Sequence, residues 1–188
     1  MPHLPEVTIT RHTPAAAKGI MEDLVTVYTE VYDTEPYRGD PFFSVETYAD
    51  RLRAAFDMPG FEVVTAHLAD TGRLVGYVHG VTLPADKPWW NSLGDQRPAD
   101  ALAAAAADEV FWLRELMVLP MYGNRGIGRA LHDAVIADRT EPWTALTCIT
   151  DNQPARNAYP RWGYQVIGQI KHAPESPVYD AMVLRPQL

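Results

Sequence analysis

The spacing of hydrophobic positions changes along the chain, and these changes predict alternating strands and helices. Residues 7–10 alternate in β-rich residues and predict a first strand. Thr13-Pro14 offers an N-cap followed by a proline in the first turn, and apolar residues then recur at helical spacing over residues 14–34. A second helix is expected over residues 44–56. The first quarter of the chain therefore predicts one strand and two helices.

The rest of the chain is richer in strands. Two strands, over residues 61–69 and 73–83, are joined by Asp70-Thr71-Gly72, a sequence typical of a hairpin turn. Residues 84–108 contain prolines, glycines and an alanine run, and they predict a partly helical insertion. The elements expected after it are a strand, a helix, a strand, a helix and two closing strands, over residues 110–118, 126–138, 143–150, 153–162, 164–170 and 178–184.

This order of elements predicts an α/β (α+β) protein with a mixed sheet flanked by helices, and 188 residues suit a single domain over residues 1–188. The net charge of −8 argues against a nucleic-acid partner. The single cysteine, Cys148, excludes an intrachain disulfide and a cysteine-rich metal site, and no metal is expected. The chain has no long apolar run and no signal pattern, so we expect a cytoplasmic protein without a membrane partner.

The stretch with the clearest chemistry spans residues 116–132. An apolar strand ends there, and a glycine-rich turn leads into a helix. The N-terminus of a helix carries unpaired N–H groups and the positive end of the macrodipole, so it attracts anions and above all phosphates. Gly126 and Gly128 carry no side chain that would block the approach to this backbone. The alternative is a plain strand-to-helix turn whose glycines serve packing.

Two segments carry a family resemblance. Residues 118–131, VLPMYGNRGIGRAL, resemble the acetyl-coenzyme A (acetyl-CoA) motif Q/R-x-x-G-x-G/A of the GNAT (GCN5-related) N-acetyltransferases. One strand later, residues 151–164, DNQPARNAYPRWGY, are similar to the family's N-x-x-A-x-x-x-Y-x-x-x-G-F/Y helix. The resemblance implies the GNAT fold, a sheet of about seven strands with about four helices, whose fourth and fifth strands splay apart around the cofactor. One position departs from the motif, because Gly123 and Asn124 stand where a loop led by Gln or Arg is expected.

The same resemblance implies that acetyl-CoA is the acyl donor. Its pyrophosphate is expected on a cradle formed by Arg125, Gly126, Ile127, Gly128, Arg129 and Ala130. Backbone groups of Met117 and Val118 are matched to the cofactor arm, and the N–H of Val118 to the oxyanion that forms at the thioester carbonyl. Asn152 is expected to contact the cofactor and to cap a helix. Arg156 is expected to face solvent or the cofactor.

Acetyl transfer to an amine requires a neutral nitrogen and a route for its proton. Glu115 is the first candidate to bind or deprotonate the amine, and Glu109 is the second. The alternation of side chains along a strand places both acids on one face, along one groove. The alternative for Glu115 is an ion pair with Arg114 or Arg73. Tyr159 is placed like the family's general acid, which protonates the departing thiolate; the alternative is an aromatic core residue.

The acceptor side is indicated only by aromatic residues. Tyr28 and Tyr32, with Tyr37, are expected to line it by analogy with the family. Trp89 and Trp90 in the insertion are expected to be exposed and to wall a pocket for an apolar or cationic acceptor. The alternative for both tryptophans is that they cover the core or a dimer contact.

The sequence thus predicts an N-acetyltransferase that moves an acetyl group from acetyl-CoA to a primary amine of a small molecule by direct attack. The expected partner is that amine, and a homodimer is compatible with the sequence. A catalytically silent acyl-CoA sensor, an acetyltransferase for protein N-termini or lysines, and an unrelated nucleotide-binding domain are the alternatives.

Overall fold

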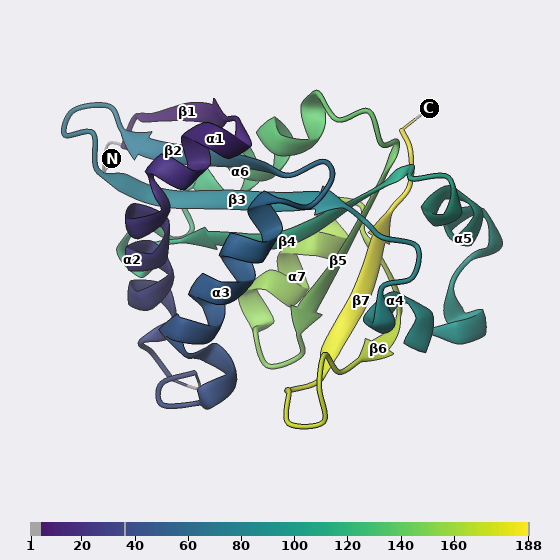
Figure 1. Ribbon diagram of the computed structural model, residues 1–188. Helices are drawn as coiled ribbons and strands as arrows, with labels where there is room; N and C mark the ends of the chain where they lie inside the picture. The colour runs from purple at the N-terminus through teal and green to yellow at the C-terminus, as the bar shows by residue number, and fades with distance from the viewer. Residues whose placement is uncertain (1–4, 36, 188) are drawn as a thin grey trace. The chain divides into compact units, whose positions relative to one another are not determined.

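The computed structural model describes residues 5–35 and 37–187, which form seven strands, seven α-helices and three short 3₁₀ helices (Figure 1). The strands are β1 (Val7–His12), β2 (Glu62–Leu68), β3 (Leu74–Thr82), β4 (Val110–Val118), β5 (Trp143–Ile149), β6 (Gln165–Ile170) and β7 (Tyr179–Leu184). The α-helices are α1 (Pro14–Gly19), α2 (Met21–Tyr32), α3 (Val45–Phe56), α4 (Pro88–Ser92), α5 (Ala99–Ala106), α6 (Ile127–Ala137) and α7 (Gln153–Arg161). The 3₁₀ helices are η1 (Pro41–Phe43), η2 (Gly94–Gln96) and η3 (Pro120–Tyr122).

The strands form one mixed sheet in the order β1-β2-β3-β4-β5-β7-β6, which confirms the expected fold class. Parallel pairing between β4 and β5 covers only the first residues of each strand, from Val110 opposite Trp143 to Trp112 opposite Ala145. The described residues contain more helices than the four or so expected. One reason is that the insertion folds into α4, η2 and α5, as its composition indicated.

The other reason is a break in the first predicted helix. Residues 14–34 were expected to form one helix, but α1 ends at Gly19 and α2 begins at Met21. Ile20 between them has φ −114° and ψ 16°, outside the helical region. Glycine disfavours the helix interior by about 1 kcal/mol relative to alanine, which favours the end of α1 at Gly19. The apolar spacing continues through this position, although the helical backbone does not.

The chain divides into two compact units, and each is described by itself. Unit 1 comprises Met1–Val81 and Glu115–Asp138, and unit 2 comprises Thr82–Arg114 and Arg139–Leu188. The expectation of a single domain stays a prediction.

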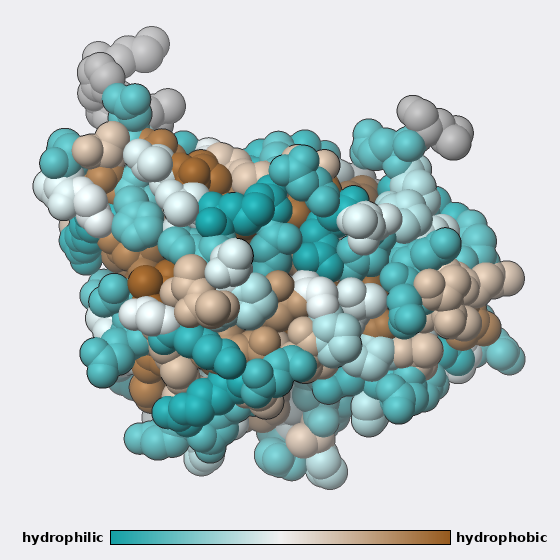
Figure 2. Space-filling model, turned by 45° about the horizontal axis from the view of Figure 1, so that its top comes forward, coloured by the Kyte–Doolittle hydropathy of each residue, from teal (hydrophilic) through white to brown (hydrophobic). Residues whose placement is uncertain are grey.

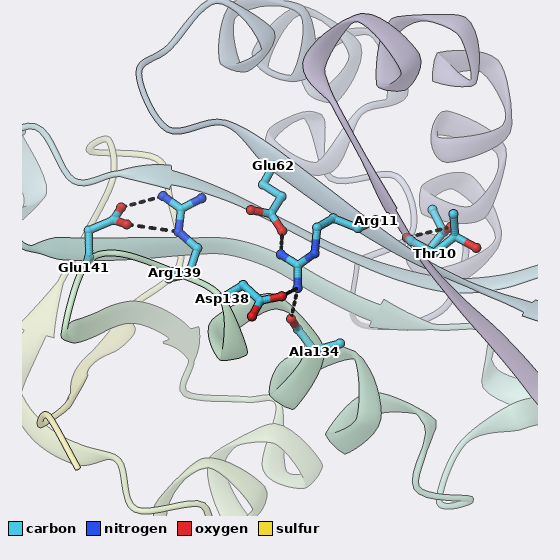
Figure 3. Close-up of polar contacts among 8 residues, drawn as sticks. Thr10, Arg11, Glu62, Ala134, Asp138, Arg139 and Glu141 are labelled. Carbon is cyan, nitrogen blue, oxygen red and sulfur yellow. Dashed lines mark hydrogen bonds and ion pairs between the residues drawn. The ribbon is translucent and has the colours of Figure 1, made fainter. Parts of the chain in front are cut away.

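In unit 1, β2 pairs with β1 and β3 in antiparallel ladders. Helix α1 lies in front of β1 and β2 (Figure 1), α2 packs against α3, and α6 packs against β1 and β2. Arg11 of β1 joins three elements, because it pairs with Glu62 of β2 and donates to the carbonyl of Ala134 in α6 at 2.5 Å (Figure 3). Asp138 lies 3.4 Å from the same guanidinium.

In unit 2, β7 pairs antiparallel with both β5 and β6. The insertion packs closely on β6, since a Cβ at Gly168 would lie 2.8 Å from the side chain of Leu93. A buried ion pair also holds this unit. Glu141 accepts from Arg139 at 2.5 and 3.1 Å (Figure 3) and from the hydroxyl of Thr82 at 3.0 Å.

The surface shown in Figure 2 is covered mainly by hydrophilic residues, and hydrophobic residues appear there in small patches. Among the helices in the described part of the chain, none combines the length and apolar character needed to cross a membrane.

Candidate functional site

The glycine-rich turn after β4 has an unusual backbone. Its residues Asn124 and Gly126 both have positive φ angles, 58° and 81°. Glycine adopts this left-handed region freely, and asparagine adopts it more readily than most other residues. Asn124 therefore suits the shape of the turn, which gives a physical reason for the departure from the family motif. An asparagine beside glycines was the sequence signal for this conformation.

The turn leaves the N-terminus of α6 open. Gly126 is the N-cap residue and provides no side-chain hydrogen bond, and the first turn of α6 contains no acidic residue. The first N–H groups of the helix thus lack partners within the helix and carry its positive dipole. A Cβ at Gly128 would lie 3.9 Å from Val118, an ordinary contact distance. These features fit a phosphate-bearing cofactor that approaches the backbone.

Two exposed arginines add positive charge to this turn. The guanidinium of Arg125 lies 5.9 Å from the ring centroid of Tyr122, and Arg129 donates to Asp133 at 3.0 Å. Arg129 thus shares its charge with a carboxylate one helical turn away. Of the other expected cradle residues, Ile127 is buried and Ala130 is half-buried, so they can offer only backbone groups.

The end of β4 is held close to β3. The N–H of Leu119 donates to the carbonyl of Val75 at 2.8 Å. A Cβ at Gly76 would lie 2.7 Å from the carbonyl oxygen of Met117, so only glycine fits there without a shift. This close packing fixes the backbone of Met117 and Val118, the residues matched to the cofactor arm. Their contacts with the cofactor stay predictions.

Glu115 is half-buried in β4 and lies close to three tyrosines of unit 1. Burial raises the pKa of Tyr28, Tyr48 and Tyr77, and the charge of Glu115 raises it further in each case. For Tyr28, the guanidinium of Arg51 acts in the opposite direction, but burial outweighs it, so these phenols stay neutral. The role of Glu115 as a base stays a prediction.

The hydroxyls of this group form a chain with a fixed direction. Tyr77 donates to the backbone carbonyl of Leu24 at 2.9 Å, so its one proton is used there. Tyr48, 2.6 Å away, must then donate to Tyr77. Nε2 of His79 lies 3.3 Å from the hydroxyl of Tyr48 and is the donor in that contact. A chain that ends on a carbonyl fixes the positions of the rings and does not pass a proton onward.

The two arginines proposed as partners of Glu115 have other contacts. Arg73 lies 3.5 Å from Glu30, and the guanidinium of Arg114 lies 4.7 Å from the ring centroid of Trp112. Glu109, the second candidate base, is exposed and lies just before β4. The expectation that Glu115 and Glu109 lie along one groove stays a prediction.

Tyr159 lies in α7 of unit 2 and is 8% exposed. The rings of Trp162 and Tyr164 meet it edge-on, at centroid distances of 5.3 and 5.4 Å. Tyr159 is thus part of an aromatic cluster, as its alternative interpretation held. Its role as a general acid stays a prediction.

Asn152 and Arg156 both have hydrogen-bond partners within unit 2. The side chain of Asn152 accepts from the N–H of Ala155 at 3.3 Å, which confirms its capping role. Arg156 was expected to face solvent or the cofactor, but its Nε donates to Asp180 at 2.6 Å. Asp180 is 3% exposed, and a buried carboxylate needs a counter-charge. Arg156 thus anchors α7 to β7 while its side chain remains 35% exposed. The cofactor contacts of Arg156 and Asn152 stay predictions.

Trp89 and Trp90 are not exposed, so that expectation is wrong. They are 3% and 0% exposed, and the ring of Trp89 packs against Trp112 at 5.7 Å. The short helix α4 folds the insertion back so that the apolar surface of both indoles is removed from solvent. This burial favours folding. The structure places them in the core of unit 2, as the alternative interpretation held.

Tyr28 and Tyr32 line a pocket of about 260 Å³ in unit 1. Tyr28 is buried, and its hydroxyl donates to the carbonyl of Phe43 at 3.2 Å. The sequence analysis had not identified the other residues of this pocket, Thr29, Asp33, Arg38, Gly39, Asp40, Pro41, Phe43, Ser44 and Val45; Tyr37 also lines it. The signal in the sequence was the aromatic pair Phe42-Phe43, which follows soon after three tyrosines at 28, 32 and 37.

Cys148 is a buried thiol in β5. Burial raises the pKa of the Cys148 thiol to about 12, so it stays protonated. Within the described ranges, no group of three or more His, Cys, Asp or Glu side chains is arranged to hold a metal ion.

Comparisons with known proteins place this geometry in context. The sequence profile of the acetyltransferase (GNAT) family matches residues 19–164. No curated protein matches the sequence significantly. Among solved structures, PH1933 from Pyrococcus horikoshii OT3 is similar at 19% identity and a TM-score of 0.65, over 97% of this chain and all of the other.

Two further structures were solved with ligands. NAA60 from Arabidopsis thaliana, in complex with a bisubstrate analogue, is 15% identical with a TM-score of 0.63, over 96% of this chain and 98% of the other. PaiA N-acetyltransferase from Thermoplasma acidophilum, in complex with coenzyme A, is 14% identical with a TM-score of 0.59, over 96% and 99%. At these identities the likeness shows the fold, and it confirms the fold that the two motifs implied.

Proposed function

The chain belongs to the GNAT acetyltransferase family, and we propose that it transfers an acetyl group from acetyl-CoA to the primary amine of a small molecule. The observation that carries this proposal is the open N-terminus of α6, with Asn124 and Gly126 in left-handed conformations before it. Backbone N–H groups from Gly126 to Ala130 would hold the pyrophosphate, and Arg125 would add charge at the rim. When bound, acetyl-CoA supplies an acyl group activated as a thioester.

The proposed transfer assigns a task to each candidate residue. The amine nitrogen forms a bond to the acyl carbon while the bond from that carbon to sulfur breaks. Glu115 would take the proton that leaves the nitrogen, and the family resemblance would give Tyr159 the role of protonating the thiolate. The backbone N–H of Val118 stabilises negative charge on the acyl oxygen. Most of the rate enhancement would come from positioning and electrostatics, since no covalent enzyme intermediate is required.

A small amine as acceptor is supported by the net charge of the protein and by the size of the pocket in unit 1. The protein has a net charge of −8, which favours a cationic acceptor over an anionic one. The pocket of about 260 Å³ is at the small end of ligand sites and suits part of a small molecule. Trp89 and Trp90 give no support for the acceptor, because both are buried.

The test is an assay of free coenzyme A released from acetyl-CoA across a panel of amines and peptides, with products identified by mass spectrometry. We expect release only with an acceptor and a product heavier by one acetyl group. Tight binding of acetyl-CoA without transfer to any member of the panel would favour the sensor. Greater thermal stabilisation by ATP or NAD than by acetyl-CoA would favour an unrelated nucleotide-binding domain.

A matched pair of variants tests the cradle by calorimetric titration with acetyl-CoA. Gly126→Val places a branched side chain in a left-handed turn at the proposed site, and we expect at least a tenfold weaker affinity. Gly72→Val imposes a similar backbone strain, φ +73° against +81°, in the β2–β3 turn. It should leave the affinity unchanged. Equal losses in both variants would mean that strain, and not the site, explains the effect.

A further inference from the structure

The pocket of unit 1 is dominated by aromatic rings. Tyr32 stacks on Tyr28 at a centroid distance of 4.3 Å and on Phe43 at 5.4 Å, and Tyr37 meets Phe43 edge-on at 4.9 Å. All four rings line the pocket. Aromatic faces and edges of this kind recognise a further ring through stacking and edge-to-face contacts.

The charged groups on the pocket lining are engaged with one another or with the backbone. Asp33 accepts from Nε of Arg38 at 3.0 Å. Asp40 accepts from the N–H of Phe42 at 2.9 Å, at the start of η1. Two carboxylates against one guanidinium also disfavour an anionic ligand. The lining thus favours a ligand through aromatic contacts more than through contact with a single charged group.

Tyr28 connects this pocket with Glu115. Its ring forms a wall of the pocket and also stacks on Tyr48 at 3.7 Å. Hydrogen bonds from Leu119 to Val75 and from Leu83 to Val110 pair β4 antiparallel with β3, and this register places Glu115 opposite His79. Nε2 of His79 lies 3.3 Å from the hydroxyl of Tyr48, whose ring stacks on Tyr28. The pocket and the candidate base are thus connected through these residues, and both belong to unit 1.

We propose that this pocket binds the aryl group of an arylalkyl amine, so that the primary amine of the acceptor lies near Glu115. This inference rests on the proposed acetyl transfer and names its acceptor class. A cavity of about 150 Å³ encloses benzene, so about 260 Å³ holds one ring and a short linker. The same chemistry occurs in a free arylalkyl amine and at the N-terminus of a peptide that begins with phenylalanine.

The experiment compares 2-phenylethylamine, a short peptide amide beginning with Phe, and n-butylamine as an acceptor without a ring. We expect kcat/KM to be at least tenfold higher for an aromatic acceptor than for n-butylamine. The aromatic acceptor with the higher value identifies the source. Binding of 2-phenylethylamine is measured separately, by saturation-transfer NMR on the protein without acetyl-CoA.

Three variants locate the effect. Tyr32→Ala removes a wall and should lower the ratio of kcat/KM for the aromatic acceptor to kcat/KM for n-butylamine about tenfold. Thr29→Phe fills the pocket from an exposed helical position and should do the same with little effect on folding. The control is Phe42→Ala, whose ring lies beside Phe43 but is not part of the lining, and it should leave the preference intact.

The outcomes separate the two proposals. Equal kcat/KM for n-butylamine and the aromatic acceptors, unchanged by Tyr32→Ala and Thr29→Phe, would overturn the acceptor class while acetyl transfer stands. Binding of 2-phenylethylamine that Thr29→Phe abolishes, without acetylation of any amine, would support the pocket and overturn the transfer. Absence of binding and of any aromatic preference would overturn the inference.

Discussion

Unit 1 gathers tyrosines between a pocket and Glu115, whereas unit 2 gathers Trp89, Trp90 and Trp112 in its core. The tyrosines keep hydroxyls that meet one another and the backbone, as in the 2.6 Å contact between Tyr48 and Tyr77. In the tryptophan group, Nε1 of Trp89 and of Trp90 is buried without a hydrogen-bond partner among the described residues.

Cations lie over aromatic rings in both units. In unit 2, Lys87 and Arg114 lie over the ring of Trp112 at 4.9 and 4.7 Å, and Arg97 lies over Trp90 at 5.6 Å. In unit 1, Arg51 lies 5.6 Å from the ring centroid of Phe42, and Arg73 and Arg125 lie 5.8 and 5.9 Å from that of Tyr122. The difference between the units is that Tyr28, Tyr32 and Tyr37 line a pocket, whereas Trp89 and Trp90 are buried in the core. Aromatic residues in a sequence indicate a binding surface only when the fold leaves a pocket beside their rings.

The largest expected effect is on catalysis in unit 1. Glu115→Gln removes the candidate base, and we expect kcat/KM for the amine to fall about 10²- to 10⁴-fold, the usual range for general base catalysis. Acetyl-CoA affinity and the midpoint of thermal unfolding should stay within error of the parent protein. Glu109→Gln is the control and should be fully active. A loss with Glu109→Gln and not with Glu115→Gln would reverse the assignment.

The next effect is on the stability of unit 2. Trp90→Ala removes a fully buried indole, and we expect a loss of about 3–5 kcal/mol in the free energy of unfolding, measured in urea. The KM of the protein that remains folded should not change. A loss below about 1 kcal/mol, together with a raised KM for the amine, would instead place Trp90 in the acceptor site.

Acid should weaken the buried ion pair of unit 2. Burial raises the pKa of Glu141, but hydrogen bonds from Arg139 and Thr82 outweigh it and hold that pKa below its ordinary 4.5. The pair therefore stabilises the fold above pH 4.5, and this contribution is lost as pH falls through the lowered pKa. Glu141→Gln should cost about 3 kcal/mol at pH 7, because it leaves Arg139 buried without its counter-charge.

The measurement is urea unfolding of both proteins from pH 7 to pH 3. The difference between them should be constant above pH 4.5 and should shrink below it. The exposed pair of Arg53 and Asp50 provides the control, since Asp50→Asn should cost less than about 1 kcal/mol at pH 7. A difference between parent and Glu141→Gln that does not change with pH would contradict the role of the ion pair.

The smallest effect tests the hydroxyl chain of unit 1. Tyr48→Phe removes one hydroxyl between Tyr77 and His79, and we expect a loss of about 1–2 kcal/mol in thermal unfolding experiments. The maximal rate of acetyl transfer should change less than twofold, because the chain ends on the carbonyl of Leu24. A tenfold fall in that rate with unchanged stability would show that the chain carries protons after all.

The sequence predicted the order of strands and helices well, because apolar spacing records which faces are buried. It also located the turn before α6, since glycines at the start of a helix leave its first N–H groups accessible to a ligand. It did not predict the break at Gly19, where apolar spacing continues through a backbone irregularity. The left-handed conformation of Asn124 was not predicted, although an asparagine beside glycines is a sequence signal for it.

The errors in the candidate site have one physical origin. Trp89 and Trp90 were assigned from residue type, but their burial depends on partners elsewhere in the sequence. The ion pair of Arg156 was not foreseen for the same reason. Arg156 is held by Asp180, 24 positions further along the chain, and this contact has no signature in the local sequence. Tyr28 and Tyr32 were placed by family analogy, and the structure adds the pocket that gives the placement physical content.

The most direct test of the account is a crystal structure of the protein with 2-phenylethylamine and desulfo-coenzyme A, which cannot carry an acetyl group. We predict that the pyrophosphate accepts hydrogen bonds from the backbone between Gly126 and Ala130. The phenyl ring should lie in the pocket of unit 1, against Tyr32 and Phe43, with the amine directed at Glu115. A pyrophosphate bound away from the start of α6, or a phenyl ring beside Trp89 and Trp90, would contradict it.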